Sequence, residues 1–246
     1  MKILTKEKFI EDYKNPKYAQ KAVNYLEEKR LLPLHSNPML ASITGHLIGD
    51  GSLSKDPYVG EFRFFGTQDK LLKIKEKISQ IFKIKPKKLF EKEHGFVLRY
   101  NNCRVARVLS LIGVPRGNKV MKEFDVPKWI KESNTKIIKA FLVALCDDEL
   151  SSPRRNKKGY VEPLRLKFNK SEEILERQGF IFLENVRNLF IKFEINCNPI
   201  RMNNDKYITK EGKVTRSVYF NISAKRKNLL NFRKQIGFET EKDKIT

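Results

Sequence analysis

The sequence ITGHLIGDGS stands at residues 43–52, and a segment of the same pattern, FLVALCDDE, returns at residues 141–149. Both segments are apolar, both end in acid, and small residues lie along one side of each expected helix: Gly45, Gly49, Ala140 and Ala144. Small residues let two helices pack with their backbones close together. We therefore expect two helices that lie side by side and bring their terminal carboxylates close to each other.

The elements expected after each of these helices follow one order. In the first half, a strand at 61–65 is followed by an amphipathic helix from Thr67, by strands at 87–92 and 96–101, and by a helix at 104–112. The apolar stripe of the helix from Thr67 is expected to contain Leu71, Leu72, Ile74, Ile78, Ile81 and Phe82. The second half has a strand at 164–169, a helix at 172–194, strands near 199–203 and 214–223, and a helix at 225–237. This repeat predicts an α+β fold of two pseudo-symmetric αββαββα halves, each with an antiparallel sheet.

Residues 1–34 precede the first half and read as two short helices, separated at Asn15-Pro16. Two interpretations stay open for them: a helix-turn-helix that reads DNA, or a helical hairpin that either packs on the main domain or clamps flanking DNA by charge. The expected domains are thus the helical extension at 1–34, a first half at 35–133 and a second half at 134–246.

The chain carries 51 basic and 29 acidic residues, a formal net charge of +22. Binding to a polyanion releases counterions, so this excess of charge favours nucleic acid as the partner. The alternative, a solvated lysine-rich surface like those of proteins from hot environments, would call for more acidic residues as well. The N-terminal segment lacks the apolar core of a signal peptide and no run is long enough to span a bilayer, so the expected location is the cytoplasm, away from membranes.

The two acidic segments, together with GVPRGNK at 113–119 and VPKWI at 126–130, resemble the LAGLIDADG homing endonucleases in their single-chain, two-motif form. The resemblance covers about residues 34–246. It implies two saddle-shaped sheets, a monomer that binds a long double-stranded DNA site, and hydrolysis of both strands with Mg²⁺, for which Mn²⁺ can substitute. In that family such reading frames lie in introns, as in intron homing, or in inteins.

The resemblance also implies the site. Asp50 aligns with the metal-binding acid of the first motif, and Glu149 aligns with that of the second, where Leu150 replaces the motif glycine and Asp148 is an alternative ligand. The family surrounds its metals with polar side chains. The matching positions are catalytic candidates without a metal-binding role: Gln68, Lys119, Lys170 and Lys242.

Candidate DNA contacts follow from strand alternation, since one face of each sheet is left polar when helices cover the other. Arginine reads guanine and asparagine reads adenine in the major groove, and other basic residues hold phosphates. Depending on the register of each strand, the candidates are Arg63, Arg99, Asn101, Arg165, Lys167, Arg201, Asn203, Arg216, Ser217, Tyr219 and Asn221.

Three functions remain open at this point. The first is a site-specific, metal-dependent DNA endonuclease. The second is a non-catalytic binder of the same fold, either a transcription regulator or an RNA-splicing maturase. It is favoured by the irregular ending Asp147-Asp148-Glu149-Leu150 and by the possible helix-turn-helix in residues 1–34. The third is a basic RNA-associated or ribosome-associated protein in which the repeat is only architectural.

Overall fold

The structure of the chain is a computed structural model, and it describes all residues except 94, 152–161, 177–179, 210 and 240–246. The chain forms two compact units. The first contains Met1–Gly117 and Pro127–Phe141, and the second contains Asn118–Val126 and Leu142–Thr246. The boundary crosses helix α7 (Thr135–Glu149), whose first half belongs to the first unit and whose acidic end belongs to the second.

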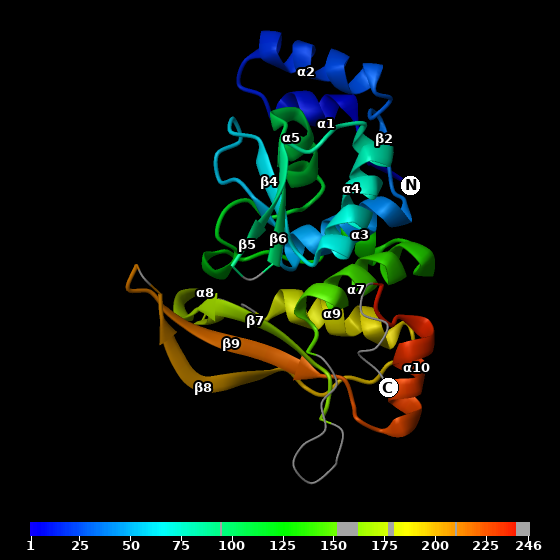
Figure 1. Cartoon of the computed structure of the whole chain (residues 1–246), viewed down its shortest axis with the longest axis vertical. Helices are drawn as coiled ribbons and strands as arrows, with labels where there is room; N and C mark the ends of the chain where they lie inside the picture. Colours follow the sequence, from blue (N-terminus) through cyan, green and yellow to red (C-terminus); the bar gives the residue numbers. More distant parts are fainter. Residues whose placement is uncertain (94, 152–161, 177–179, 210, 240–246) are drawn as a thin grey trace. The chain divides into compact units, whose positions relative to one another are not determined.

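The first unit contains a helical extension, a sheet and the helices that cover it (Figure 1). Its elements are β1 (Lys2–Leu4), α1 (Lys6–Glu11), α2 (Pro16–Glu28), β2 (Leu34–His35), α3 (Pro38–Ile48), β3 (Ser52–Leu53), β4 (Glu61–Gly66), α4 (Gln68–Phe82), β5 (Lys88–Lys92), β6 (Gly95–Asn101), α5 (Cys103–Leu111) and α6 (Lys128–Lys131). The part from α3 to α5 has the predicted order, αββαββα.

The sheet of the first unit is antiparallel, with strand order β3-β4-β6-β5. Phe62 pairs with Tyr100 and Phe64 pairs with Leu98, so these four side chains share the buried face. The rings of Phe62 and Tyr100 stack at 5.0 Å between centroids. Burying such large rings stabilises the sheet against the helices.

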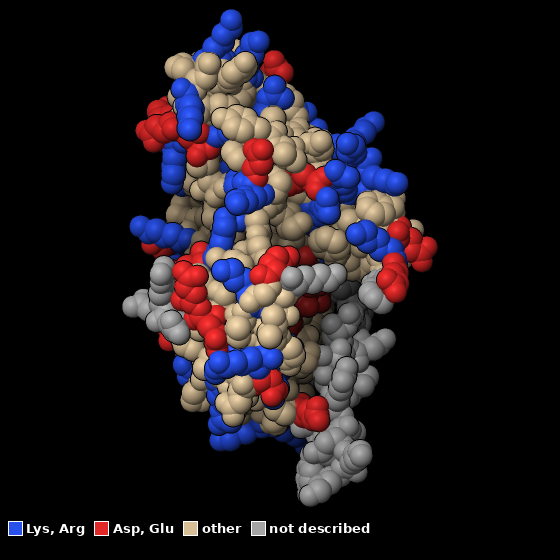
Figure 2. All heavy atoms as spheres, turned by 90° about the vertical axis from the view of Figure 1, so that its left-hand side faces the viewer, with Lys and Arg blue, Asp and Glu red and all other residues tan. Residues whose placement is uncertain are grey.

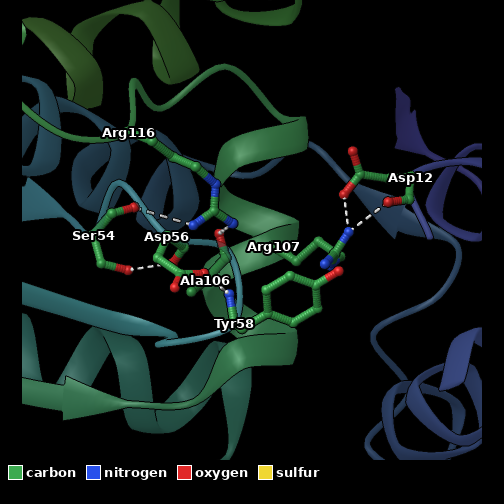
Figure 3. Close-up of polar contacts among 7 residues, drawn as sticks. All are labelled: Asp12, Ser54, Asp56, Tyr58, Ala106, Arg107 and Arg116. Atoms are coloured by element: carbon green, nitrogen blue, oxygen red, sulfur yellow. Dashed lines mark hydrogen bonds and ion pairs between the residues drawn. The ribbon is translucent and has the colours of Figure 1, made fainter. Parts of the chain in front are cut away.

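The N-terminal extension packs on α5 through a buried arginine (Figure 3). Arg107 donates to the backbone carbonyl of Asp12 at 2.6 Å and forms an ion pair with the Asp12 carboxylate. Its guanidinium also lies 3.9 Å from the ring centre of Tyr13. Phe9 and Leu26 are fully buried. The two helices of the extension thus pack on the first unit.

The second unit repeats the arrangement with a shorter first strand. Its elements are the 3-10 helix η1 (Lys119–Met121), the end of α7, β7 (Arg165–Ser171), α8 (Glu172–Glu176), α9 (Ile181–Ile191), β8 (Arg201–Ile208), β9 (Val214–Asn221) and α10 (Arg226–Gln235). The antiparallel strand order is β7-β9-β8, and an isolated bridge between Leu150 and Leu166 lies where the first unit has β3. The α+β class and the two-halves architecture are thus confirmed.

Two details of the predicted elements were wrong. The single helix expected at 172–194 is two helices, α8 and α9, and Phe180 forms a turn before α9. In α4, Leu72 was assigned to the apolar stripe but is exposed. Lys70 is buried on that stripe instead, with Ile74 and Ile78.

Candidate metal site and nucleic-acid interface

Asp50 stands in a turn directly after α3. The helix begins at Pro38, where the Asn37 side chain accepts from the Leu40 N–H at 2.9 Å. It ends in a tight turn in which the Gly51 N–H donates to the His46 carbonyl at 2.8 Å. A Cβ on Gly51 would lie 2.7 Å from that oxygen, so the turn requires glycine. The Asp50 side chain is left 47% exposed at the end of the helix.

A carboxylate at the C-terminal end of a helix is unfavourable, because the helix dipole is negative there. The structure places a cation beside it: the Lys70 ammonium lies 3.7 Å from Oδ2 of Asp50, on a side chain that is only 7% exposed. Gly66 leaves room for it, since a Cβ there would lie 2.8 Å from Lys70 Cδ. Asp50 therefore occupies a position whose electrostatics favour a neighbouring positive charge.

Sequence reasoning missed Lys70. The available signal was its spacing, four residues before Ile74 and eight before Ile78, which places a lysine on the apolar stripe of α4. Gln68, the predicted residue, is the exposed first residue of the same helix.

The end of α7 carries the three acidic residues of the second motif, and they differ in their surroundings. Asp147 is buried and accepts a hydrogen bond from the Glu239 N–H at 3.0 Å, so it ties α7 to the segment after α10. Asp148 and Glu149 are half-buried. Leu150 is buried in the bridge with Leu166, which gives a physical reason for an apolar side chain where the motif has glycine.

Lys170 lies on the helix-covered side of β7, not on its polar side. Its ammonium donates to the carbonyls of Lys119 and Lys122 at 2.7 and 2.9 Å and lies 3.8 Å from the ring centre of Phe124. Burial, with a smaller effect of the Lys119 charge and against an opposing effect of Glu123, lowers the pKa of Lys170 to about 7. The structure therefore brings Lys170 and Lys119 together, with Lys170 holding the backbone that carries Lys119.

Two further catalytic candidates differ from expectation or lie outside the described residues. Lys170 was expected to be the counterpart of Gln68, but it lies within β7, whereas Gln68 is the first residue of α4. Lys242 lies outside the described residues.

The buried Lys170 predicts a pH-dependent difference in stability. Its pKa is about 7 in the folded chain and 10.5 ordinarily, so between these values the unfolded chain binds the extra proton. Stability contributed by Lys170 therefore increases with pH across this window, by up to about 1.4 kcal/mol per pH unit. The Lys170→Met variant has no ammonium group at this position, so this contribution to the pH dependence of its unfolding free energy is absent. Urea unfolding of both proteins at several pH values should give a stability difference that changes with pH; a constant difference would contradict the assignment.

The polar face of the first sheet contains the predicted residues Arg63, Arg99 and Asn101. Arg63 stands opposite Arg99, and Glu61 stands opposite Asn101. Glu61 forms ion pairs with both arginines. The structure thus brings all three predicted residues to one face and adds an acid that sequence reasoning did not select.

The polar face of the second sheet carries five of the predicted residues in register. Arg165 pairs with Asn221 and Lys167 pairs with Tyr219. The Arg165 guanidinium lies 4.2 Å from the ring centre of Tyr219, and its Nε donates to Asn221 Oδ1 at 3.2 Å. Arg201 stands opposite Tyr219 from β8. These side chains form a basic, aromatic surface of the kind that binds nucleic acid.

Three predicted contacts differ from these in the face, the burial or the strand pairing of the residue. Arg216 is on the helix-covered side with Val218, because neighbouring strand residues point to opposite faces, and it binds Glu172 at 2.8 Å. Ser217 is on the polar side but is buried and donates to Asn169. Asn203 lies where the register between β8 and β9 is irregular.

Figure 2 shows lysine and arginine side chains spread over one face of the molecule, with acidic side chains among them. None of the helices in the described part of the chain is long and apolar enough to cross a membrane.

The Asp50 carboxylate is an oxygen donor of the kind that a hard divalent cation prefers. Among the described residues, no group of three or more His, Cys, Asp or Glu side chains could hold a metal ion. Mg²⁺ is commonly bound by one or two carboxylates and completes its shell with water and substrate phosphates. The half-exposed Asp50 fits this use of a single carboxylate.

Several proteins share the sequence pattern. The DNA-directed RNA polymerase subunit Rpo1N of Methanocaldococcus jannaschii is 29% identical over 216 residues, 78% of this chain and 16% of that protein. The tRNA-splicing ligase RtcB of Methanopyrus kandleri is 27% identical, over 90% of this chain and 23% of that protein. The replication factor C small subunit of M. jannaschii is 27% identical, over 83% of this chain and 11% of that protein. The chain spans less than a quarter of each relative, and no family model matches it.

The solved structures define the class of fold. The two-unit α+β architecture with an acid at the end of each motif helix is the LAGLIDADG fold. The homing endonuclease I-DmoI, in complex with its target DNA in the presence of Mn, matches with a TM-score of 0.52 at 17% identity, over 85% of this chain and 98% of that chain. A mesophilic variant of I-DmoI matches with a TM-score of 0.53 at 18% identity, over 83% and 96%. The resemblance seen in the sequence is thus confirmed for the fold.

Proposed function

We propose that the chain is a site-specific endonuclease that binds double-stranded DNA and hydrolyses both strands with a divalent metal ion. The observation that carries this proposal is the LAGLIDADG fold with a half-exposed aspartate, Asp50, in the turn that ends the first motif helix. The net charge of +22 and the basic faces of both sheets support a nucleic-acid partner.

The matches to unrelated proteins support the view that the coding sequence of this chain is a mobile element. An RNA polymerase subunit, an RNA ligase and a replication factor have different activities, yet each matches this chain over only 11–23% of its length. A segment common to such different proteins does not carry the activity of any of them. A coding sequence that inserts itself into different genes would leave this pattern, and a site-specific DNA break is the chemistry that such insertion needs.

In this proposal each residue has a limited task. Asp50 and Glu149 each supply a carboxylate to the metal, as the motifs imply, and Asp148 is the alternative in the second unit. A divalent metal held by these carboxylates would supply stabilisation of charge on the attacking and leaving oxygens and would lower the pKa of water. Lys119 neutralises charge near the scissile phosphate, and Lys170 positions the Lys119 backbone. The chain acts as a monomer and binds the duplex with the polar faces of its two sheets. Arg63 and Arg165 are the central contacts.

The second candidate is a non-catalytic binder of the same fold, a DNA-binding regulator or an RNA-splicing maturase. It is favoured by Leu150, which stands next to Glu149 where the motif has a flexible glycine. Leu150 is buried and forms a bridge with Leu166. One experiment separates the candidates: a randomised duplex library is incubated with the protein and Mg²⁺, and the new ends are sequenced. Breaks in both strands at one sequence support the endonuclease. Retained duplexes without breaks support the regulator, and preference for a matched RNA library supports the maturase.

Lys70 provides a further test of the Asp50 site. Lys70→Met removes the ammonium beside the carboxylate without removing the apolar stem, so Asp50 loses a group that fixes it. We expect a fall in the single-turnover cleavage rate of about tenfold to a hundredfold, as for other groups that orient metal ligands. Lys75→Met, an exposed position on the same helix, is the control. Equal rates for the two variants would exclude Lys70 from the site.

A further inference from the structure

The carboxylate of Glu61 joins two arginines on the polar face of the first sheet. Glu61 begins β4, Arg63 follows two residues later on the same face, and Arg99 stands directly opposite Arg63 in β6. Oε1 of Glu61 binds Nη2 of Arg63, and Oε2 binds Nη2 of Arg99. Each carboxylate oxygen therefore holds one guanidinium.

The Glu61 side chain is less exposed than the two arginine side chains that it binds. The Glu61 side chain is 12% exposed, whereas those of Arg63 and Arg99 are 38% and 35% exposed. A guanidinium has five N–H donors, and one Nη2 contact to Glu61 leaves others for a ligand. The acid is thus set back in the surface and the two arginines reach out from it.

Electrostatics explains why an acid is needed there. Like charges directly opposite each other in neighbouring strands destabilise a sheet. Glu61 offsets the repulsion between Arg63 and Arg99 and leaves the group with one net positive charge. It also limits the rotamer freedom of both arginine side chains.

We propose that Glu61 is a specificity-determining residue, which holds Arg63 and Arg99 as one rigid pair that reads two nearby guanines in the major groove of the target. The inference rests on the proposed function, because it needs a duplex ligand. Unrestrained arginines can turn to the phosphates, which carry no sequence information. A carboxylate beside them repels phosphates and keeps both guanidinium groups directed at the O6 and N7 acceptors of guanine.

The second sheet offers a control with the same charges. Glu172 binds Arg216 and Lys206, both at distances below 3 Å, but on the helix-covered side of β9. Glu172→Gln therefore makes the same change in net charge as Glu61→Gln, away from the polar face. Glu61→Asp keeps the charge but shortens the arm, so it cannot hold both arginines at once.

The experiment is a selection from a randomised duplex DNA library with Ca²⁺ in place of Mg²⁺, using the full chain and the three variants. We expect Glu61→Gln to bind unselected duplex about threefold to tenfold more tightly, because one negative charge is lost. We also expect it to lose the guanine preference at two positions of the selected site. Glu172→Gln should keep the guanine preference at both positions. Glu61→Asp should weaken the guanine preference at one of the two positions or at both.

Two results would count against the inference. The first would overturn the role of Glu61 alone, and the second would overturn the proposed function as well. If the wild-type chain enriches a sequence and both Glu61 variants enrich the same guanines equally strongly, Glu61 has no part in specificity. If the wild-type chain enriches no sequence, the proposed function itself fails. Circular dichroism of each variant checks folding, and Glu61→Asp supplies the answer if Glu61→Gln does not fold.

Discussion

Replacing Asp50 by asparagine is expected to lower the rate of DNA cleavage about a thousandfold, while binding of duplex DNA in Ca²⁺ changes little. The substitution keeps the shape of the side chain but removes the charge that a divalent cation requires. Metal ions contribute several kcal/mol to the stabilisation of charge in such reactions, and about 4 kcal/mol corresponds to a thousandfold in rate. Single-turnover cleavage of a selected duplex measures the effect.

Asp69→Asn is the matched control for that experiment. Asp69 is exposed in the first turn of α4, near Asp50 in the chain, and its carboxylate lies at the favourable, N-terminal end of a helix. It should lose a few tenths of a kcal/mol of stability and no catalytic power. Equal loss of cleavage in both variants would show a general charge effect and would remove Asp50 from its proposed role.

Replacing Arg107 by alanine is expected to cost about 3 kcal/mol of unfolding free energy, because it breaks the contact between α5 and the N-terminal extension. Hydrogen bonds to a charged group contribute about 1.5–3 kcal/mol, and losing one partner of a buried pair costs about 3–5 kcal/mol. We use the lower part of that range, since Asp12 is half-exposed and regains water. Urea unfolding measures the loss, and hydrogen exchange shows whether α1 and α2 open first.

Lys128→Ala provides the comparison for Arg107. Lys128 pairs with Glu132 one helical turn away, at 3.7 Å, and both side chains are largely exposed. Exposed pairs of this kind contribute only about 0.3–0.5 kcal/mol. If Arg107→Ala were no more destabilising than Lys128→Ala, the N-terminal hairpin would be held by its apolar contacts alone.

The sequence was most informative where patterning is strict. The acid-ended helix α3, the alternating strand β4 and the order of elements in the first half could be read from apolar spacing and from the Pro38 and Asn37 start signals. The second half was less regular. Its first strand is reduced to the Leu150 bridge, and pairing over a single residue has no periodicity to detect.

The candidate site was predicted less completely, for reasons of long-range geometry. The ion pair between Lys70 and Asp50 joins residues in different elements, and a lysine on an apolar stripe is normally a solvated side chain. Arg216 and Ser217 were both assigned to the polar face, although neighbouring strand residues cannot share a face and only the register decides which one points outward. Glu61 was overlooked because acids were not expected among DNA contacts.

The most direct test of the proposed endonuclease is strand-resolved cleavage of one selected duplex, first with EDTA and then with Mg²⁺ added back to the same sample. We expect no cleavage in EDTA and, after Mg²⁺ is restored, one cut in each strand at fixed positions of the selected site. Cleavage that persists in EDTA, or nicks spread evenly along both strands, would contradict it.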